Sequence, residues 1–111
     1  MTEPIQEKQL KWILVDFDKT IATNSDYPEY KPLKPVDGAK KYLDRLVKDG
    51  WKITIYTSRP WNDYDLIEKW LDKWSIPHRR IICGKAFGKY IIDDRAIEFR
   101  GNWEETFNKI K

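Results

Sequence analysis

The chain has 111 residues, 35% of them charged, and its formal net charge is +3 at pH 7. This length suits a single domain with one core, and so small a basic excess fits an anionic substrate without indicating nucleic acid. The one cysteine, Cys83, excludes an internal disulfide and favours a reducing compartment. No apolar run is long enough to span a membrane, and residues 1–11 lack the apolar core of a signal peptide. We therefore expect a cytoplasmic protein without membrane contact, with a loose N-terminal arm at 1–11.

The segment WILVDFDKT, residues 12 to 20, begins with four apolar residues that predict a strand buried on both faces. The run ends in Asp16 and Asp18, whose side chains would point the same way in an extended chain. Ligands of open parallel sheets bind at the carboxyl ends of the strands. We therefore predict that both carboxylates line a crevice there.

Strand-like and helix-like segments alternate along the rest of the chain. β-branched and aromatic runs predict further strands at 51–57, 80–83 and 90–92. Apolar stripes predict helices at 36–50, at 62–74 and, after an Asn102 cap, near the C-terminus. The proline-rich segment 21–35 should be a loop, with room for a short hairpin, over the end of the first strand. This alternation predicts parallel βαβ units and a three-layer, Rossmann-like α/β sheet in one domain spanning 1–111.

Polar residues directly follow three of the predicted strands, and Lys85 lies shortly before the fourth strand. If these ends are neighbours, one crevice holds Asp16, Asp18, Thr57, Lys85, Asp93 and Asp94. So many carboxylates repel one another and need a hard cation, and oxygen ligands suit Mg²⁺. With one His and one Cys, the chain offers no soft cluster for zinc.

A carboxylate beside a divalent ion, with lysine and threonine donors opposite it, can receive a phosphoryl group. Aspartate can act as the nucleophile and form an acyl phosphate. A second acid can protonate the leaving oxygen and then deprotonate the attacking water. The crevice therefore predicts phosphoryl-transfer chemistry.

The motifs resemble those of the haloacid dehalogenase (HAD) superfamily of phosphohydrolases, over roughly residues 12 to 110. Its D-x-D-x-T motif matches Asp16 to Thr20, and its apolar strand ending in a hydroxyl residue matches ITIYT, ending at Thr57. Its lysine matches Lys85, and its acid pair after an apolar strand matches YIIDD.

The resemblance implies roles for these residues. Asp16 would be the nucleophile and Asp18 the acid/base, and Thr57 and Lys85 would bind the phosphoryl group. Magnesium would be held by the Asp16 carboxylate, the Asp18 backbone carbonyl and Asp93, supported by Asp94. The implied strand order is 3-2-1-4, with the strands counted along the chain. We expect further substrate contacts from Ser58, Arg59 and Arg95, which directly follow the motif strands.

Two departures from the family pattern bear on the site. Position 19 is often Gly in the family and is Lys here. Many relatives also carry a cap domain after the first motif or between the second and third motifs, and both intervals are too short for one here. The chain thus resembles a capless member, whose site stays open or is closed by a second copy in a homo-oligomer.

The resemblance leaves the substrate open. We expect a sugar phosphate or a similar small metabolite. The alternative is a polynucleotide 3′-phosphatase, because the fold could gather a basic patch from Lys19, Lys31, Lys34, Arg59 and Arg95. An alternative of another class is a receiver-like or catalytically silent phosphate-binding module. A receiver, however, carries its phosphoacceptor after the third strand, where this chain has Cys83 and Gly84.

Overall fold

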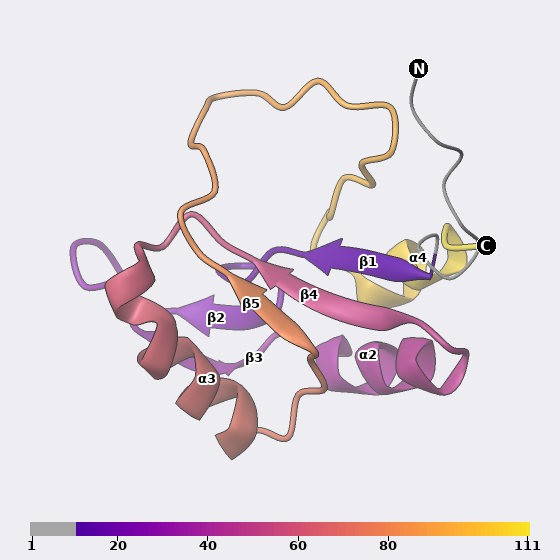
Figure 1. Cartoon of the computed structure of the whole chain (residues 1–111), viewed down its shortest axis with the longest axis horizontal. Helices are drawn as coiled ribbons and strands as arrows, with labels where there is room; N and C mark the ends of the chain where they lie inside the picture. Colours follow the sequence, from indigo (N-terminus) through magenta and orange to yellow (C-terminus); the bar gives the residue numbers. More distant parts are fainter. Residues whose placement is uncertain (1–10) are drawn as a thin grey trace.

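The computed structural model describes residues 11–111, which form an α/β fold around a three-stranded parallel sheet (Figure 1). Strands β1 (Trp12–Val15), β4 (Lys52–Tyr56) and β5 (Arg80–Ile82) pair in the order β1-β4-β5. Helix α2 (Ala39–Lys48) leads into β4, and the 3-10 turn η1 (Trp61–Asp63) and helix α3 (Tyr64–Lys73) lead into β5. Helix α4 (Trp103–Asn108) lies near the C-terminus. The predicted arm at 1–11 lies outside the described residues, except for Lys11.

The core lies between the sheet and the helices. Side chains alternate between the two faces of a strand, and Val15, Ile53 and Ile55 on one face are almost fully buried. The apolar stripes of the helices meet this face, so Leu43 of α2 and Leu71 of α3 are inaccessible to water. Burial of these stripes fixes the helices on the sheet.

The sequence predictions at 12–15, 51–57 and 80–83 are confirmed by β1, β4 and β5, and those at 36–50 and 62–74 by α2 and α3. Asn102 caps α4, since its side chain accepts a hydrogen bond of 2.9 Å from the Glu105 amide. The segment 21–35 contains the antiparallel hairpin of β2 (Ala22–Asn24) and β3 (Pro32–Pro35). These elements could be predicted because apolar periodicity, turn residues and capping residues are short-range sequence patterns.

The prediction of three layers is wrong for the described residues, which form two. Because β1, β4 and β5 follow one another across the sheet in one direction, right-handed crossovers place α2 and α3 on the same face. Helix α4 packs beside α2 through Phe107 and Tyr42, whose ring centroids are 5.1 Å apart. The expectation that β1 is buried on both faces is therefore also wrong, and Leu14 is 58% exposed.

The fourth strand predicted at 90–92 is not formed in the structure. The chain between β5 and α4 runs out as a long loop beyond the sheet (Figure 1). Ile92 is fully exposed and Tyr90 is 79% exposed, so the apolar run that predicts a strand has no packing partner among residues 11–111.

None of the helices in this range is long and apolar enough to cross a membrane.

Candidate functional site

Asp16 lies directly after β1, at the carboxyl edge of the sheet. Its Oδ1 is 3.7 Å from the Lys85 Nζ, and the Thr20 hydroxyl donates to its Oδ2 at 3.4 Å. Partial burial raises the pKa of the Asp16 carboxyl, while Lys85 acts against this shift. The side chain is nevertheless 43% exposed, so a ligand can reach it.

Thr57 and Lys85 are brought together by the backbone at the ends of β4 and β5. The Thr57 amide donates to the Ile82 carbonyl at 3.0 Å, and the Lys85 amide donates to the Thr57 carbonyl at 2.9 Å. The Thr57 hydroxyl accepts from the Arg59 amide at 3.1 Å, which leaves its own proton free to donate. The structure thus places a hydroxyl and an ammonium donor at the edge that carries Asp16.

Asp18 is held by Arg59. The guanidinium donates from Nε to both carboxylate oxygens, at 3.1 and 3.0 Å, and from Nη2 to Oδ1 at 2.8 Å. The same guanidinium donates to Asp63 at 3.3 Å and to the backbone carbonyl of Tyr30. Burial of Arg59 opposes its charge, but the hydrogen bonds and charges of Asp18 and Asp63 outweigh this, so the pKa of Arg59 is raised. Arg59 therefore ties Asp18, the hairpin and the start of the α3 region together.

Two side chains that contact this cluster were not predicted from the sequence. Asn24 donates from Nδ2 to Asp18 Oδ1 at 2.7 Å, and Asp63 is the second ion-pair partner of Arg59. The contact of Asn24 depends on the turn after β1, which returns the chain to Asp18 within six residues. No local motif marks either residue.

The remaining predicted site residues lie elsewhere. Asp93 and Asp94 sit in the loop between β5 and α4, where Arg95 is within 4.0 Å of Asp93 and 3.8 Å of Asp94. Among residues 11–111, no three His, Cys, Asp or Glu side chains are grouped closely enough to hold a metal ion. Ser58 is exposed beside Thr57. The structure therefore brings together Asp16, Asp18, Thr57, Lys85 and Arg59, and leaves Asp93, Asp94 and Arg95 apart.

Arg59→Met should destabilise the fold by about 2 kcal/mol, because Asp18 and Asp63 lose charge-assisted hydrogen bonds in a half-buried setting. Arg95→Met is the matched control. Its ion pairs are 83% exposed on the arginine side and should be worth at most about 0.5 kcal/mol. Urea unfolding at pH 7 measures both. Equal losses in the two variants would show that the Arg59 contacts do not stabilise the fold.

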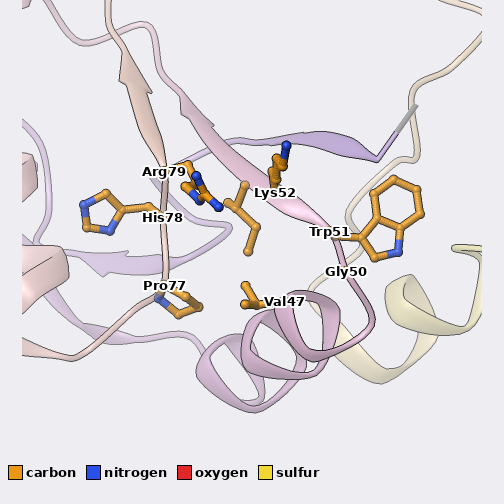
Figure 2. Close-up of a pocket in the computed structure, with 8 residues that line it drawn as sticks. Val47, Gly50, Trp51, Lys52, Pro77, His78 and Arg79 are labelled. Carbon is orange, nitrogen blue, oxygen red and sulfur yellow. The ribbon is translucent and has the colours of Figure 1, made fainter. Parts of the chain in front are cut away.

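A cavity lies at the opposite, amino-terminal edge of the sheet (Figure 2). It measures about 270 Å³ and is lined by Val47, Gly50, Trp51, Lys52, Ile53, Pro77, His78 and Arg79. No carboxylate lines it, and the His78 ring points away from Lys52 (Figure 2). His78 lies in a loop, and its Nδ1 is 2.9 Å from the Ile76 carbonyl oxygen.

Cys83 is a buried small side chain, and burial raises the pKa of its thiol.

Comparison with known proteins gives one structural similarity. No protein-family model matches the chain. No curated protein matches it either. Among solved structures, the chain is similar to the crystal structure of a structural-genomics target from Vibrio cholerae, with 27% sequence identity and a TM-score of 0.67. The similarity covers 90% of this chain and 98% of that one. It supports the α/β fold class and carries no statement of function.

Proposed function

We propose that this chain is a magnesium-dependent phosphatase that hydrolyses a phosphate monoester through an aspartyl-phosphate on Asp16. One observation carries the proposal. Asp16, Thr57 and Lys85 converge at the carboxyl edge of the sheet, with Lys85 Nζ 3.7 Å from Asp16 Oδ1. A nucleophile and an ammonium donor therefore lie 3.7 Å apart where ligands of parallel sheets bind, and Thr57, fully buried, directly follows the neighbouring strand.

In the proposed reaction an Asp16 carboxylate oxygen attacks phosphorus, and the bond from phosphorus to the ester oxygen breaks. Asp18 supplies the proton that the leaving alkoxide needs. In the second half, Asp18 takes a proton from a water molecule that attacks phosphorus, and the acyl-phosphate bond breaks to release phosphate and free Asp16. Lys85 and the Thr57 hydroxyl stabilise the charge on the transferring oxygens.

Arg59 must release Asp18 for this role, because its guanidinium occupies both carboxylate oxygens with three hydrogen bonds and keeps them from the leaving group. We propose that the incoming phosphoryl group takes over the Arg59 hydrogen bonds. Phosphate offers a guanidinium the same bidentate geometry as a carboxylate. The exchange would free Asp18 when substrate is bound.

Magnesium fits the chemistry of the donors, since Asp16 and Asp18 present only hard oxygens. When bound, the ion would withdraw charge from the transferring phosphoryl group. In the described arrangement Lys85 and Arg59 already neutralise these two carboxylates, so a further acid is required. Asp93, supported by Asp94, is the acid we propose.

We propose that residues 90–92 bring Asp93 to the site by adding to β1 as a fourth parallel strand. Within residues 11–111, β1 pairs with β4 on one edge only. The exposed Leu14, Ile91 and Ile92 would be buried by this addition. A parallel strand begins at the amino edge, so the connection must cross three strand spacings of 4.8 Å, about 14 Å, and also return about 10 Å along three residues of strand. These two components give a straight path of about 17 Å. Residues 83–89 can span about 23 Å at 3.3 Å per residue, so the connection reaches when it is extended.

The alternative functions receive less support. Arg95, one of the five cations that would form a nucleic-acid patch, is paired with Asp93 and Asp94 in the loop between β5 and α4. β5 is followed by Cys83 and Gly84, so no acid stands where a receiver domain carries its phosphoacceptor. A catalytically silent module would bind phosphate through the same residues without turnover, and the assay below separates it from an enzyme.

The purified protein is expected to hydrolyse 4-nitrophenyl phosphate in the presence of Mg²⁺. EDTA should lower the rate at least about 100-fold, and excess Mg²⁺ should restore it, because Asp93 docked beside Asp16 and Asp18 would add a negative charge that repels the anionic substrate unless a cation is bound. Release of 4-nitrophenol measures both steps. Full activity in EDTA would contradict the metal requirement. Phosphate binding without hydrolysis of any monoester would favour the silent module.

A further inference from the structure

A polar cavity lies next to Asp18, on the inner side of the β2–β3 hairpin. Its volume is about 430 Å³, and it is open to solvent, since Lys19, Asp26, Tyr27 and Tyr30 are exposed. It is lined by Lys19, Thr23, Asn24, Ser25, Asp26, Tyr27, Tyr30 and Val36. Asn24 connects it to the acid site through its 2.7 Å hydrogen bond to Asp18. Because Asp18 is the acid proposed to protonate the leaving oxygen, the cavity adjoins the leaving-group side of the proposed site.

Two residues of the cavity are held in a conformation that their side chains disfavour. Lys19 has a φ of 63° and Tyr30 a φ of 48°, and only Ser75 shares this feature among non-glycine residues 11–111. Left-handed backbone is costly for residues with a Cβ, and most so for bulky ones. The Lys19 amide bonds to the Ala22 carbonyl and to Asn24 Oδ1, which holds the strained turn in place. Strain of this kind gathers at ligand-binding sites.

Glycine at position 19 would adopt this backbone without cost. The lysine side chain should therefore have a use that offsets the strain. Its Nζ lies 5.8 Å from the centroid of the Tyr30 ring, so the side chains of the two strained residues contact each other in the lining of the cavity. The Tyr27 ring stands edge-on to Tyr30, with the centroids 5.8 Å apart.

The unused hydrogen-bonding groups of the cavity define what it can bind. Lys19 Nζ offers donors, and the Asp26 carboxylate, which has no ion-pair partner within residues 11–111, offers acceptors. Their charges cancel, so the lining does not favour a second phosphate or a polyanion. The exposed tyrosines offer aromatic faces. Neutral polyhydroxylated groups match this set, because their hydroxyls both donate and accept while their C–H faces pack on aromatic rings.

We propose that this cavity is the leaving-group subsite and that it selects phosphate monoesters of sugars or polyols, with Lys19 as the residue that determines specificity. The proposal rests on the phosphatase function proposed above. It assigns Lys19 and Asp26 to hydroxyl recognition and Tyr30 to stacking, on the leaving-group side of Asp18.

The test compares Lys19→Gly and Asp26→Asn with wild type on ribose 5-phosphate, glucose 6-phosphate, glycerol 3-phosphate and 4-nitrophenyl phosphate. For the best of the three polyhydroxylated substrates, each variant should lower the ratio of its kcat/KM to that of the aryl phosphate at least about tenfold. Glu29→Gln, in the same hairpin but outside the lining, should keep the wild-type ratio. Lys19→Gly should melt at the same temperature as wild type or a few degrees higher, because it relieves the strained φ.

An unchanged ratio in Lys19→Gly overturns the subsite while leaving the phosphatase function intact. So does a 3′-phosphorylated oligonucleotide that is the best substrate and whose hydrolysis falls steeply with salt. If wild type hydrolyses no monoester, the proposed function fails, and calorimetric titration of the same sugar phosphates decides the subsite. The titration compares Asp16→Asn alone with Asp16→Asn combined with Lys19→Gly. A Kd at least about tenfold weaker in the combined variant supports the subsite, and equal Kd values overturn it.

Discussion

Asp16→Asn is expected to lower hydrolysis of 4-nitrophenyl phosphate by about 10⁴-fold, as the loss of a nucleophile does in other hydrolases. An amide oxygen carries no charge, so it attacks phosphorus poorly and binds Mg²⁺ weakly. Thr57 and Lys85 would still bind the phosphoryl group, because their backbone hydrogen bonds remain, although the Lys85 ammonium loses its 3.7 Å ion pair with Asp16. Product formation under single-turnover conditions measures the loss.

The same substitution should raise the melting temperature at pH 7 in EDTA. Because the pKa of Asp16 is raised above 3.8, the folded state holds this proton more tightly than the unfolded state does. Ionised Asp16 therefore costs stability above the folded pKa, and this cost disappears as the pH falls below 3.8. The gain of Asp16→Asn should vanish over the same range. It should be small, because 43% of the side chain remains exposed.

Asp37→Asn, in the exposed turn before α2, serves as the matched control for both readouts and should change neither. Near wild-type activity in Asp16→Asn would remove Asp16 from the role of nucleophile. A melting temperature that falls at pH 7 would mean that the contact with Lys85 outweighs the desolvation of the carboxyl.

Most of the sheet and its helices could be predicted because their signals are local. The apolar stripe of α2 contains Leu43 and Leu46 at helical spacing, and both are buried as expected. The carboxyl-edge residues could be predicted for a related reason. In a parallel sheet the carboxyl ends of all strands lie at the same edge, so the polar residues that follow the strands are brought to that edge. Asp16, Thr57 and Lys85 meet in this way.

The features that could not be predicted depend on contacts between residues far apart in the sequence, which no local pattern indicates. Whether an apolar strand is covered on its second face depends on the path of the connection that follows β5, and residues 84–101 supply no helix there. The pairing of Arg59 with Asp18 needs the turn after β4 and the hairpin to arrive at the same point. Lys19 and Tyr30 owe their strained backbone to the hairpin as a whole. Composition and periodicity carry none of this.

Ile92→Lys is expected to lower magnesium-dependent activity at least about 100-fold and to destabilise the fold by several kcal/mol. The reason is that the proposed fourth strand would bury a side chain that is fully exposed when the loop is undocked. An ammonium group buried beside β1 without a partner would oppose docking. Asp93 would then stay away from Asp16, and the affinity for Mg²⁺ would fall with it. Activity as a function of Mg²⁺ concentration, together with urea unfolding, measures both effects.

Ile97→Lys is the matched control, since Ile97 lies in the same loop and outside the proposed strand. It adds the same charge to the same segment, so it should cost less than about 1 kcal/mol and leave the Mg²⁺ dependence unchanged. If Ile92→Lys behaves like this control, residues 90–92 remain in solvent in the active protein. Asp16 and Asp18 would then have to bind Mg²⁺ without Asp93. A loss confined to Ile92→Lys would instead place Asp93 at the end of a strand beside β1, within reach of the carboxylate of Asp16.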